Sequence, residues 1–215
     1  MREKASYSLG VLLGAQLRRL GLSPDSIAFD KVTQGLHDVV KGTVEPTAAD
    51  QQNIQELIRG VMQGRQASAG KNQAEARKFL AENAKRKGIV TTASGLQYKV
   101  LSAGSGASPR PTDEVTVNYR GTLIDGTEFD SSYKRHEPAT FTVSKVIPGW
   151  QEALVLMKPG AKWQLFIPPE LAYGTDSPPP IPPGSMLKFD VELLSVRPAS
   201  APPAGAVPDV GGGAR

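Results

Sequence analysis

The hydrophobic period of the chain changes once, at Gly88, and this change constrains the fold more than any other feature. Before Gly88 the large apolar residues recur about every 3.6 positions, a period typical of amphipathic helices. From Ile89 onward, segments such as 95–101 and 114–119 alternate apolar and polar side chains, as half-buried strands do. A chain of 215 residues with helices first and strands second is expected to have an α+β architecture.

The helices expected at the start of the chain are short. Leucines at helical spacing predict one over residues 5–21. Ser23-Pro24-Asp25 is typical of a second helix start, with Ser as the cap and Pro in the first turn. We interpret residues 1–46 as an all-helical dimerisation domain, because so small a region cannot hide its own apolar stripes. A homodimer through residues 1–62 would cover them.

A third, much longer helix is expected over residues 47–88. Thr47-Ala-Ala-Asp50 is a variant of the capping box and marks its start. Its apolar stripe ends at Met62, and no large apolar residue follows until Phe79. This long connecting helix is therefore either a solvated stalk or broken near Gly70.

Residues 89–197 are expected to form an antiparallel sheet of five or six strands, wrapped on one short helix. The apolar run Glu152–Met157 predicts that helix, and Lys158-Pro-Gly160 closes it. The remaining residues, 198–215, are mostly Pro, Gly and Ala and have little to bury, so we expect a disordered tail.

Composition excludes several classes of function. The chain has no Cys and two His, which argues against disulfides, thiol catalysis, a metal site or a cofactor held by such ligands. Its formal net charge of +4 comes without a basic run interleaved with aromatics, so nucleic-acid binding is not expected. No long apolar run predicts a membrane span, and no signal peptide is evident in the sequence.

Aromatic residues beside Gly or Asp mark the part of the chain that carries chemistry. Tyr119, Phe129, Trp150 and Tyr173 fall in such blocks, at expected turns or strand ends. The blocks contain neither Cys nor His, and no Ser-His-Asp order accompanies them. This pattern predicts an apolar, aromatic-lined pocket rather than a nucleophile or a metal centre.

The same blocks resemble the FKBP-type peptidyl-prolyl isomerases, and the resemblance covers residues 89–197. The matching motifs are Asp125-Gly-Thr-Glu-Phe-Asp130, Val146-Ile-Pro-Gly-Trp150, Ala172-Tyr-Gly174, Ile181-Pro-Pro-Gly184 and Phe189-Asp-Val-Glu-Leu193. The motif Tyr7-Ser-Leu-Gly10, the long polar helix and Ser94-Gly-Leu-Gln-Tyr98 resemble the Mip/FkpA-like bacterial subgroup. An FKBP-like antiparallel sheet is the fold that this resemblance implies.

The resemblance also implies an activity and the residues that perform it. The activity is cis-trans isomerisation of Xaa-Pro bonds in unfolded or exported proteins, with chaperone activity and without a metal or cofactor. Three residues are implied as catalytic: Tyr119, Asp130 and Tyr173. Seven are implied as substrate-binding: Phe129, Phe141, Val146, Ile147, Trp150, Ile181 and Phe189.

Partners and location follow from the resemblance as well. It implies proline-containing polypeptide clients and macrolide inhibitors of the FKBP class. It further implies a periplasmic, outer-membrane associated or secreted bacterial protein.

Several other interpretations are compatible with the residues alone. The chain could be a non-catalytic chaperone or binding module that keeps the prolyl pocket. Trp150 and Phe189 could be ordinary core aromatics, and Asp130 could be a solvated turn residue or one of a carboxylate pair with Glu128. The segment 177–184 could be a polyproline ligand or a stiff loop over the pocket.

Overall fold

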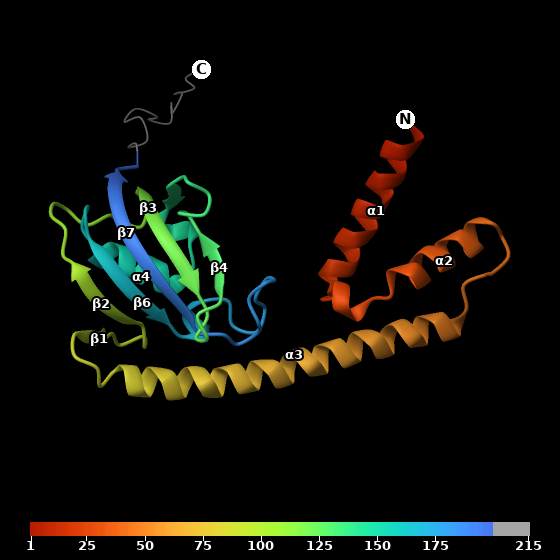
Figure 1. Ribbon diagram of the computed structural model, residues 1–215, viewed down its shortest axis with the longest axis horizontal. Helices are drawn as coiled ribbons and strands as arrows, with labels where there is room; N and C mark the ends of the chain where they lie inside the picture. The colour runs from red at the N-terminus through yellow and green to blue at the C-terminus, as the bar shows by residue number, and fades with distance from the viewer. Residues whose placement is uncertain (200–215) are drawn as a thin grey trace, which may run out of the picture. The chain divides into compact units, whose positions relative to one another are not determined.

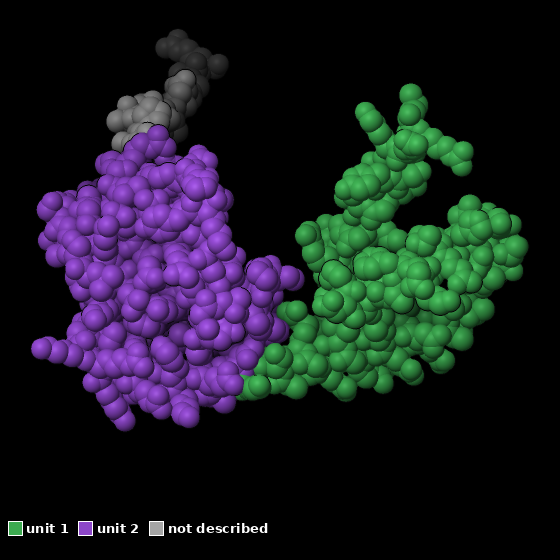
Figure 2. All heavy atoms as spheres, viewed as in Figure 1, with its two compact units in different colours: residues 1–71 green, residues 72–215 purple. Residues whose placement is uncertain are grey.

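The structure is a computed structural model that describes residues 1–199 (Figure 1). These residues belong to two compact units, Met1–Lys71 and a second that begins at Asn72 (Figure 2). The tail expected over residues 198–215 lies outside the described residues, apart from its first two. The expected α+β architecture is confirmed, with helices in the first unit and an antiparallel sheet in the second.

The first unit holds α1 (Arg2–Arg19), a 3-10 turn (Pro24–Ser26), α2 (Phe29–Val40) and the beginning of α3 (Ala48–Asn83). The start signal at Ser23 produces only the 3-10 turn, and α2 begins later than the sequence suggests. The Ser26 hydroxyl both accepts from the Ser23 N–H and donates to the Ser23 carbonyl, which closes this turn on itself. Ile27 and Ala28 are then extended, so a new helix has to start at Phe29.

The long helix α3 begins at its expected capping box and is not broken. Asp50 accepts hydrogen bonds from the Thr47 N–H (2.8 Å) and the Thr47 hydroxyl (2.7 Å), while its own N–H donates to Thr47 Oγ1 (3.3 Å). The helix continues through Gly70 and ends at Asn83, five residues before the predicted end at Gly88. Of the two alternatives left open by the sequence, the structure has the continuous helix. No helix within residues 1–199 is both long enough and apolar enough to cross a membrane.

The apolar stripes of the first unit remain uncovered. Within residues 1–62 the structure buries only Leu22. Leu12 on α1, Leu36 and Val40 on α2 and Ile54 on α3 are all more than half exposed. This unit therefore has almost no core of its own.

The second unit is built on seven antiparallel strands, where five or six were expected, because short pairings at β1, β4 and β5 extend the sheet. The strands are β1 (Ile89–Thr91), β2 (Gln97–Ser102), β3 (Glu114–Thr122), β4 (Glu128–Ser131), β5 (Ala139–Thr142), β6 (Lys162–Ile167) and β7 (Leu187–Arg197). Their order is β1-β2-β6-β7-β3-β4, and β5 pairs with the first half of β3. The short helix α4 packs on the sheet; it spans Pro148–Leu156 and so begins four residues before the predicted run.

The main core lies between α4 and one face of this sheet. Alternate residues of β3, β6 and β7, such as Val117, Leu165 and Val191, point to this face and are almost fully buried. Trp150 and Leu154 of α4 pack against them. The alternation read from the sequence thus marks the face that the helix covers.

The last turns of α3 cover part of the opposite face of the sheet. Phe166, between the inward-facing neighbours of β6, packs with Ala76 and Met186, and its ring lies 5.9 Å from that of Phe79. A buried amide pair extends this contact, since Asn83 donates to Gln97 Oε1 at 2.9 Å. The second compact unit therefore begins at Asn72, within α3. The predicted start of this domain, Ile89, is 17 residues later.

We expect a fragment of residues 72–215 to be more stable than one of residues 89–215. The shorter fragment exposes Phe166 and Met186, and each large apolar side chain contributes about 1.5–3 kcal/mol when buried. Urea unfolding followed by tryptophan fluorescence measures the difference. Phe79→Ala in the longer fragment should lie between the two, and equal unfolding midpoints for both fragments would contradict this role of α3.

Candidate active site

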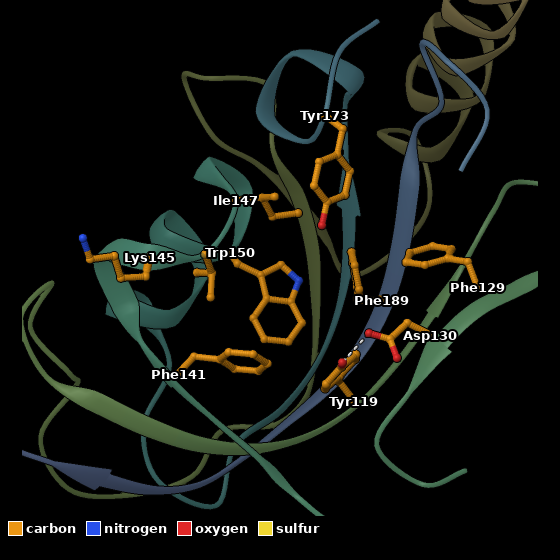
Figure 3. A pocket seen from close by; sticks show the side chains of 10 residues that line it. Tyr119, Phe129, Asp130, Phe141, Lys145, Ile147, Trp150, Tyr173 and Phe189 are labelled. Carbon is orange, nitrogen blue, oxygen red and sulfur yellow. Dashed lines mark hydrogen bonds between the residues drawn. The ribbon is translucent and has the colours of Figure 1, made fainter. Parts of the chain in front are cut away.

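One cavity of about 300 Å³ opens at the edge of the main core, where β3, β4, β5 and β7 meet the start of α4 (Figure 3). Its walls are mostly aromatic and aliphatic. The lining residues are Tyr119, Phe129, Asp130, Phe141, Lys145, Val146, Ile147, Trp150, Tyr173 and Phe189. A cavity of this size with a few polar groups at its rim has the character of a small-ligand site.

Trp150 forms the floor of the cavity. It lies in the first turn of α4, behind Pro148, and is only 4% exposed. Three rings meet its indole at nearly right angles: Tyr119 at 5.3 Å, Phe141 at 6.0 Å and Phe189 at 5.2 Å between ring centres. Such edge-to-face packing is favourable for aromatic pairs and fixes the floor in one orientation.

Two glycines let these elements come close enough. A Cβ on Gly149 would lie 2.5 Å from Ile167 Cγ2, so only glycine lets the first turn of α4 approach β6 this closely. A Cβ on Gly121 would lie 2.7 Å from the Phe129 ring and 2.8 Å from the Phe189 ring. The glycines in the aromatic motifs therefore make room for the walls of the cavity.

A hydrogen-bonded group of three side chains lies at one side of the cavity. The Tyr119 hydroxyl donates to Asp130 Oδ2, while Arg135 donates to Asp130 Oδ1. Arg135 also donates to the Tyr119 hydroxyl oxygen at 2.8 Å, and its guanidinium carbon lies 5.4 Å from the centre of the Tyr119 ring. Both oxygens of Asp130 are thus engaged, and the carboxylate is held in place.

These contacts set the protonation of the group. Burial alone would raise the pKa of Asp130, but the hydrogen bonds from Tyr119 and Arg135 and the charge of Arg135 outweigh it and hold this pKa below its ordinary value. Burial and the hydrogen bond to Asp130 raise the pKa of the Tyr119 hydroxyl. At neutral pH Asp130 is therefore ionised and Tyr119 neutral.

Tyr173 and Ile147 line the cavity on other sides and each carries a hydrogen-bond donor. The Tyr173 hydroxyl points into it, and burial together with the charge of Asp130 raises its pKa, so it stays protonated at neutral pH (Figure 3). Ile147 is the N-cap residue of α4, so its N–H lies at a helix end where backbone donors lack intrahelical acceptors. The arrangement can hold an apolar ring on Trp150 and donate to two carbonyl oxygens.

The structure brings together all the predicted site residues except one. Ile181 is buried in the core next to the cavity but does not line it. Two residues at the cavity are not among those predicted from the sequence: Arg135, which binds Asp130, and Lys145, which lines the rim. Neither belongs to an aromatic motif, and a basic residue in a turn gives no sequence signal that separates it from ordinary surface charge.

Comparison with known proteins identifies relatives over almost the whole chain. The family model described as FKBP-type peptidyl-prolyl cis-trans isomerase matches residues 106–194, and that of the domain amino-terminal to such isomerases matches residues 2–100. Peptidyl-prolyl cis-trans isomerase Mip of Coxiella burnetii is 46% identical over 203 residues, covering 91% of this chain and 87% of the relative. Outer membrane protein MIP of Legionella longbeachae is 42% identical over 206 residues, with 93% and 87% covered. The crystal structure of FkpA from Escherichia coli superposes with a TM-score of 0.66 at 40% identity, covering 91% of this chain and 96% of that one.

We expect Arg135→Gln to raise the pKa of Asp130. The substitution removes one hydrogen bond and the nearby positive charge while burial remains. In the wild type, the stabilising contribution of the Asp130 carboxylate is present above the ordinary carboxylate pKa and is lost as pH falls through the lowered pKa. In Arg135→Gln this contribution should be smaller, and its loss should be complete at a higher pH. Carbon NMR of the Asp130 carboxyl through an acid titration measures the change.

Lys134→Gln is the matched control for this experiment. Lys134 is the neighbouring base and pairs with Glu128 at 2.9 Å rather than with Asp130. Removing the charge of Lys134 should leave the pKa of Asp130 unchanged. An Asp130 pKa that is the same in Arg135→Gln and in the wild type would show that Arg135 does not hold this carboxylate.

Proposed function

The chain belongs to the FKBP-type peptidyl-prolyl cis-trans isomerases, and from this membership we infer that the cavity over Trp150 is where it rotates Xaa-Pro bonds. It is an enzyme that interconverts the cis and trans forms of the bond before proline. The observation that supports this site most directly is the buried indole of Trp150, which is framed by three rings and open on the cavity side.

The apolar cavity suits the physics of the reaction. Rotation about a peptide bond has to pass a twisted amide, against a barrier of about 20 kcal/mol. The planar amide is more dipolar than the twisted one, because twisting removes the resonance between nitrogen and carbonyl. A water-poor, aromatic surrounding therefore disfavours the planar ground state relative to the twisted transition state, and this difference lowers the barrier.

The polar groups would hold the substrate while the bond turns. The prolyl ring lies on the Trp150 indole, and the Ile147 N–H and Tyr173 hydroxyl bind carbonyls of the peptide. Asp130, held by Arg135 and Tyr119, orients the rim and accepts hydrogen bonds without transferring a proton. Macrolide inhibitors of the FKBP class would occupy the same cavity.

The chain would act as a dimeric folding helper rather than as an isolated isomerase. Residues 1–62 leave their apolar stripes exposed and bury only Leu22, so a second copy is the cover that explains them best. Two cavities carried by one dimer would meet an unfolded client at two places. This proposal adds chaperone activity to the isomerase.

The proposed place of action is outside the cytoplasm, in the periplasm or at the outer membrane. It is supported by the name of one relative, Outer membrane protein MIP of Legionella longbeachae, which is similar over 93% of this chain. Fractionation of cells that express the native gene, followed by immunoblotting of each fraction, tests the location.

We expect Asp130→Leu and Tyr173→Phe each to lower kcat/KM on a short Xaa-Pro peptide by roughly tenfold, which corresponds to about 1.4 kcal/mol. Each change removes a hydrogen-bonding group from the cavity rather than volume from the core. A protease-coupled isomerisation assay measures the rate.

The wild-type kcat/KM should not change between pH 6 and 8. The lowered pKa of Asp130 and the raised pKa values of Tyr119 and Tyr173 keep these groups from titrating in this range.

Tyr98→Phe is the control for these two variants. Tyr98 also presents an aromatic ring, but it stacks on Trp163 with 4.3 Å between ring centres and does not line the cavity. It should keep the wild-type rate. A wild type that binds such peptides without accelerating their isomerisation would instead favour a non-catalytic binding module.

We expect Leu36→Asp combined with Val40→Asp to give a monomer. Both side chains lie on the apolar side of α2 and are 52% and 85% exposed, and a buried carboxylate in their place would oppose association. Light scattering measures the mass. The variant should isomerise short peptides normally but lose rate on a full-length unfolded protein, because the second cavity no longer raises the local concentration of enzyme.

Lys31→Gln combined with Gln34→Asp is the matched control, since it makes the same change in net charge. At helical spacing these positions lie away from the apolar side of α2, so the control should remain a dimer. A wild-type protein that is monomeric at micromolar concentration would contradict both the proposed dimer and the proposed two-site folding helper. The isomerase activity of a single chain would remain.

A further inference from the structure

The two sides of the cavity differ in how their charged side chains are paired. On one side the negative charge of Asp130 is paired with Arg135, and the nearby Glu128 is paired with Arg120 and Lys134. On the other side Lys145 lines the rim, and the ion pairs found among residues 1–199 do not include it. In Figure 3, Lys145 lies beside the start of α4, across Trp150 from Asp130.

The backbone that carries Lys145 is fixed on both sides. Lys145 ends a 3-10 turn (Val143–Lys145) whose Val143 N–H donates to the Asp113 carbonyl at 3.0 Å. After the turn, the Gln151 side chain donates to the Val146 carbonyl at 2.7 Å. The ammonium group therefore extends from a defined point of the rim rather than from a loose loop.

Nearby groups do not cancel this charge. The carboxylate of Asp113 accepts the N–H groups of Arg110 at 2.8 Å and Ala199 at 3.1 Å, and it forms no ion pair with Lys145. The nine-residue helix α4 begins three residues after Lys145, and the amino end of a helix adds partial positive charge. This side of the rim therefore carries a positive charge that has no ion-pair partner among residues 1–199, while each charged group named on the opposite side is ion-paired.

A peptide whose proline lies on Trp150 has to leave the cavity in two directions. In Figure 3, Lys145 and Asp130 lie on opposite sides of Trp150, so a peptide that crosses the cavity in that direction passes both side chains. Resting on the proposed function of this cavity, we propose that Lys145 is a specificity-determining residue that favours substrates with an acidic side chain next to the proline, on the flank that passes the start of α4. The preferred clients are then unfolded chains with Glu or Asp beside proline.

The test uses four peptides and compares rates in pairs. Two carry Glu or Gln directly before the proline, and two carry Glu or Gln directly after it. For wild-type protein, kcat/KM should be about two- to fivefold higher for Glu than for Gln at one flank only, the range typical of a solvent-exposed ion pair. Raising the salt concentration should reduce this ratio toward one.

Variants of Lys145 assign the preference to this side chain. Lys145→Gln should bring the Glu/Gln ratio to one, and Lys145→Glu should invert it. Lys158→Glu is the control, since it makes the same change in net charge in an exposed residue beyond the far end of α4, and it should keep the wild-type ratio.

The outcomes separate this proposal from the function on which it rests. Isomerisation of the Gln peptides with a Glu/Gln ratio of one at both flanks would overturn the role of Lys145 and leave the isomerase intact. A Glu/Gln ratio above one that persists in Lys145→Gln would also overturn the role of Lys145 and leave the isomerase intact. Inactivity on all four peptides would overturn the proposed site of catalysis, and the preference with it.

Discussion

The packing of the first turn of α4 against the sheet is the contact on which both the core and the cavity depend. Gly149 brings this turn against Ile167, and the same turn presents Trp150 to the rings of Tyr119, Phe141 and Phe189. The floor of the cavity is therefore an uncovered part of the hydrophobic core. The same aromatic contacts stabilise the core and shape the cavity, so the surface that we propose as the prolyl site is already ordered and would lose little entropy on binding.

The carboxylate among these rings, that of Asp130, is stabilised by its neighbours. An ionised carboxylate beside an apolar cavity is unfavourable unless hydrogen bonds replace the water it has lost. Tyr119 and Arg135 supply those bonds to Asp130, and the positive charge of Arg135 balances it. The result is a rim with fixed dipoles and fixed protonation, which suits a reaction in which no proton has to move.

Much of this site could be predicted from the sequence because its signals are local. Aromatic residues beside glycines, and strands that alternate, mark the rings and the face on which they gather. Arg135 and Ile181 could not be placed in this way, since their positions depend on how loops fold over the sheet. The start of the second unit could not be predicted for a similar reason. Phe79 lies near the end of the polar helix α3, and its partner Phe166 lies 87 residues later on β6. Contacts of such long separation leave no period in the sequence.

The two units divide the work of the chain in a way that follows from where each buries its apolar residues. The second unit encloses its own core and every residue that lines the cavity, so we expect catalysis to need nothing from residues 1–71. The first unit buries almost nothing, so its apolar stripes are available for association. A cavity that binds one proline through a ring and a few hydrogen bonds holds an unfolded chain only briefly. Association through the first unit would then prolong the encounter by supplying a second cavity, without demanding that either one bind tightly and hinder release.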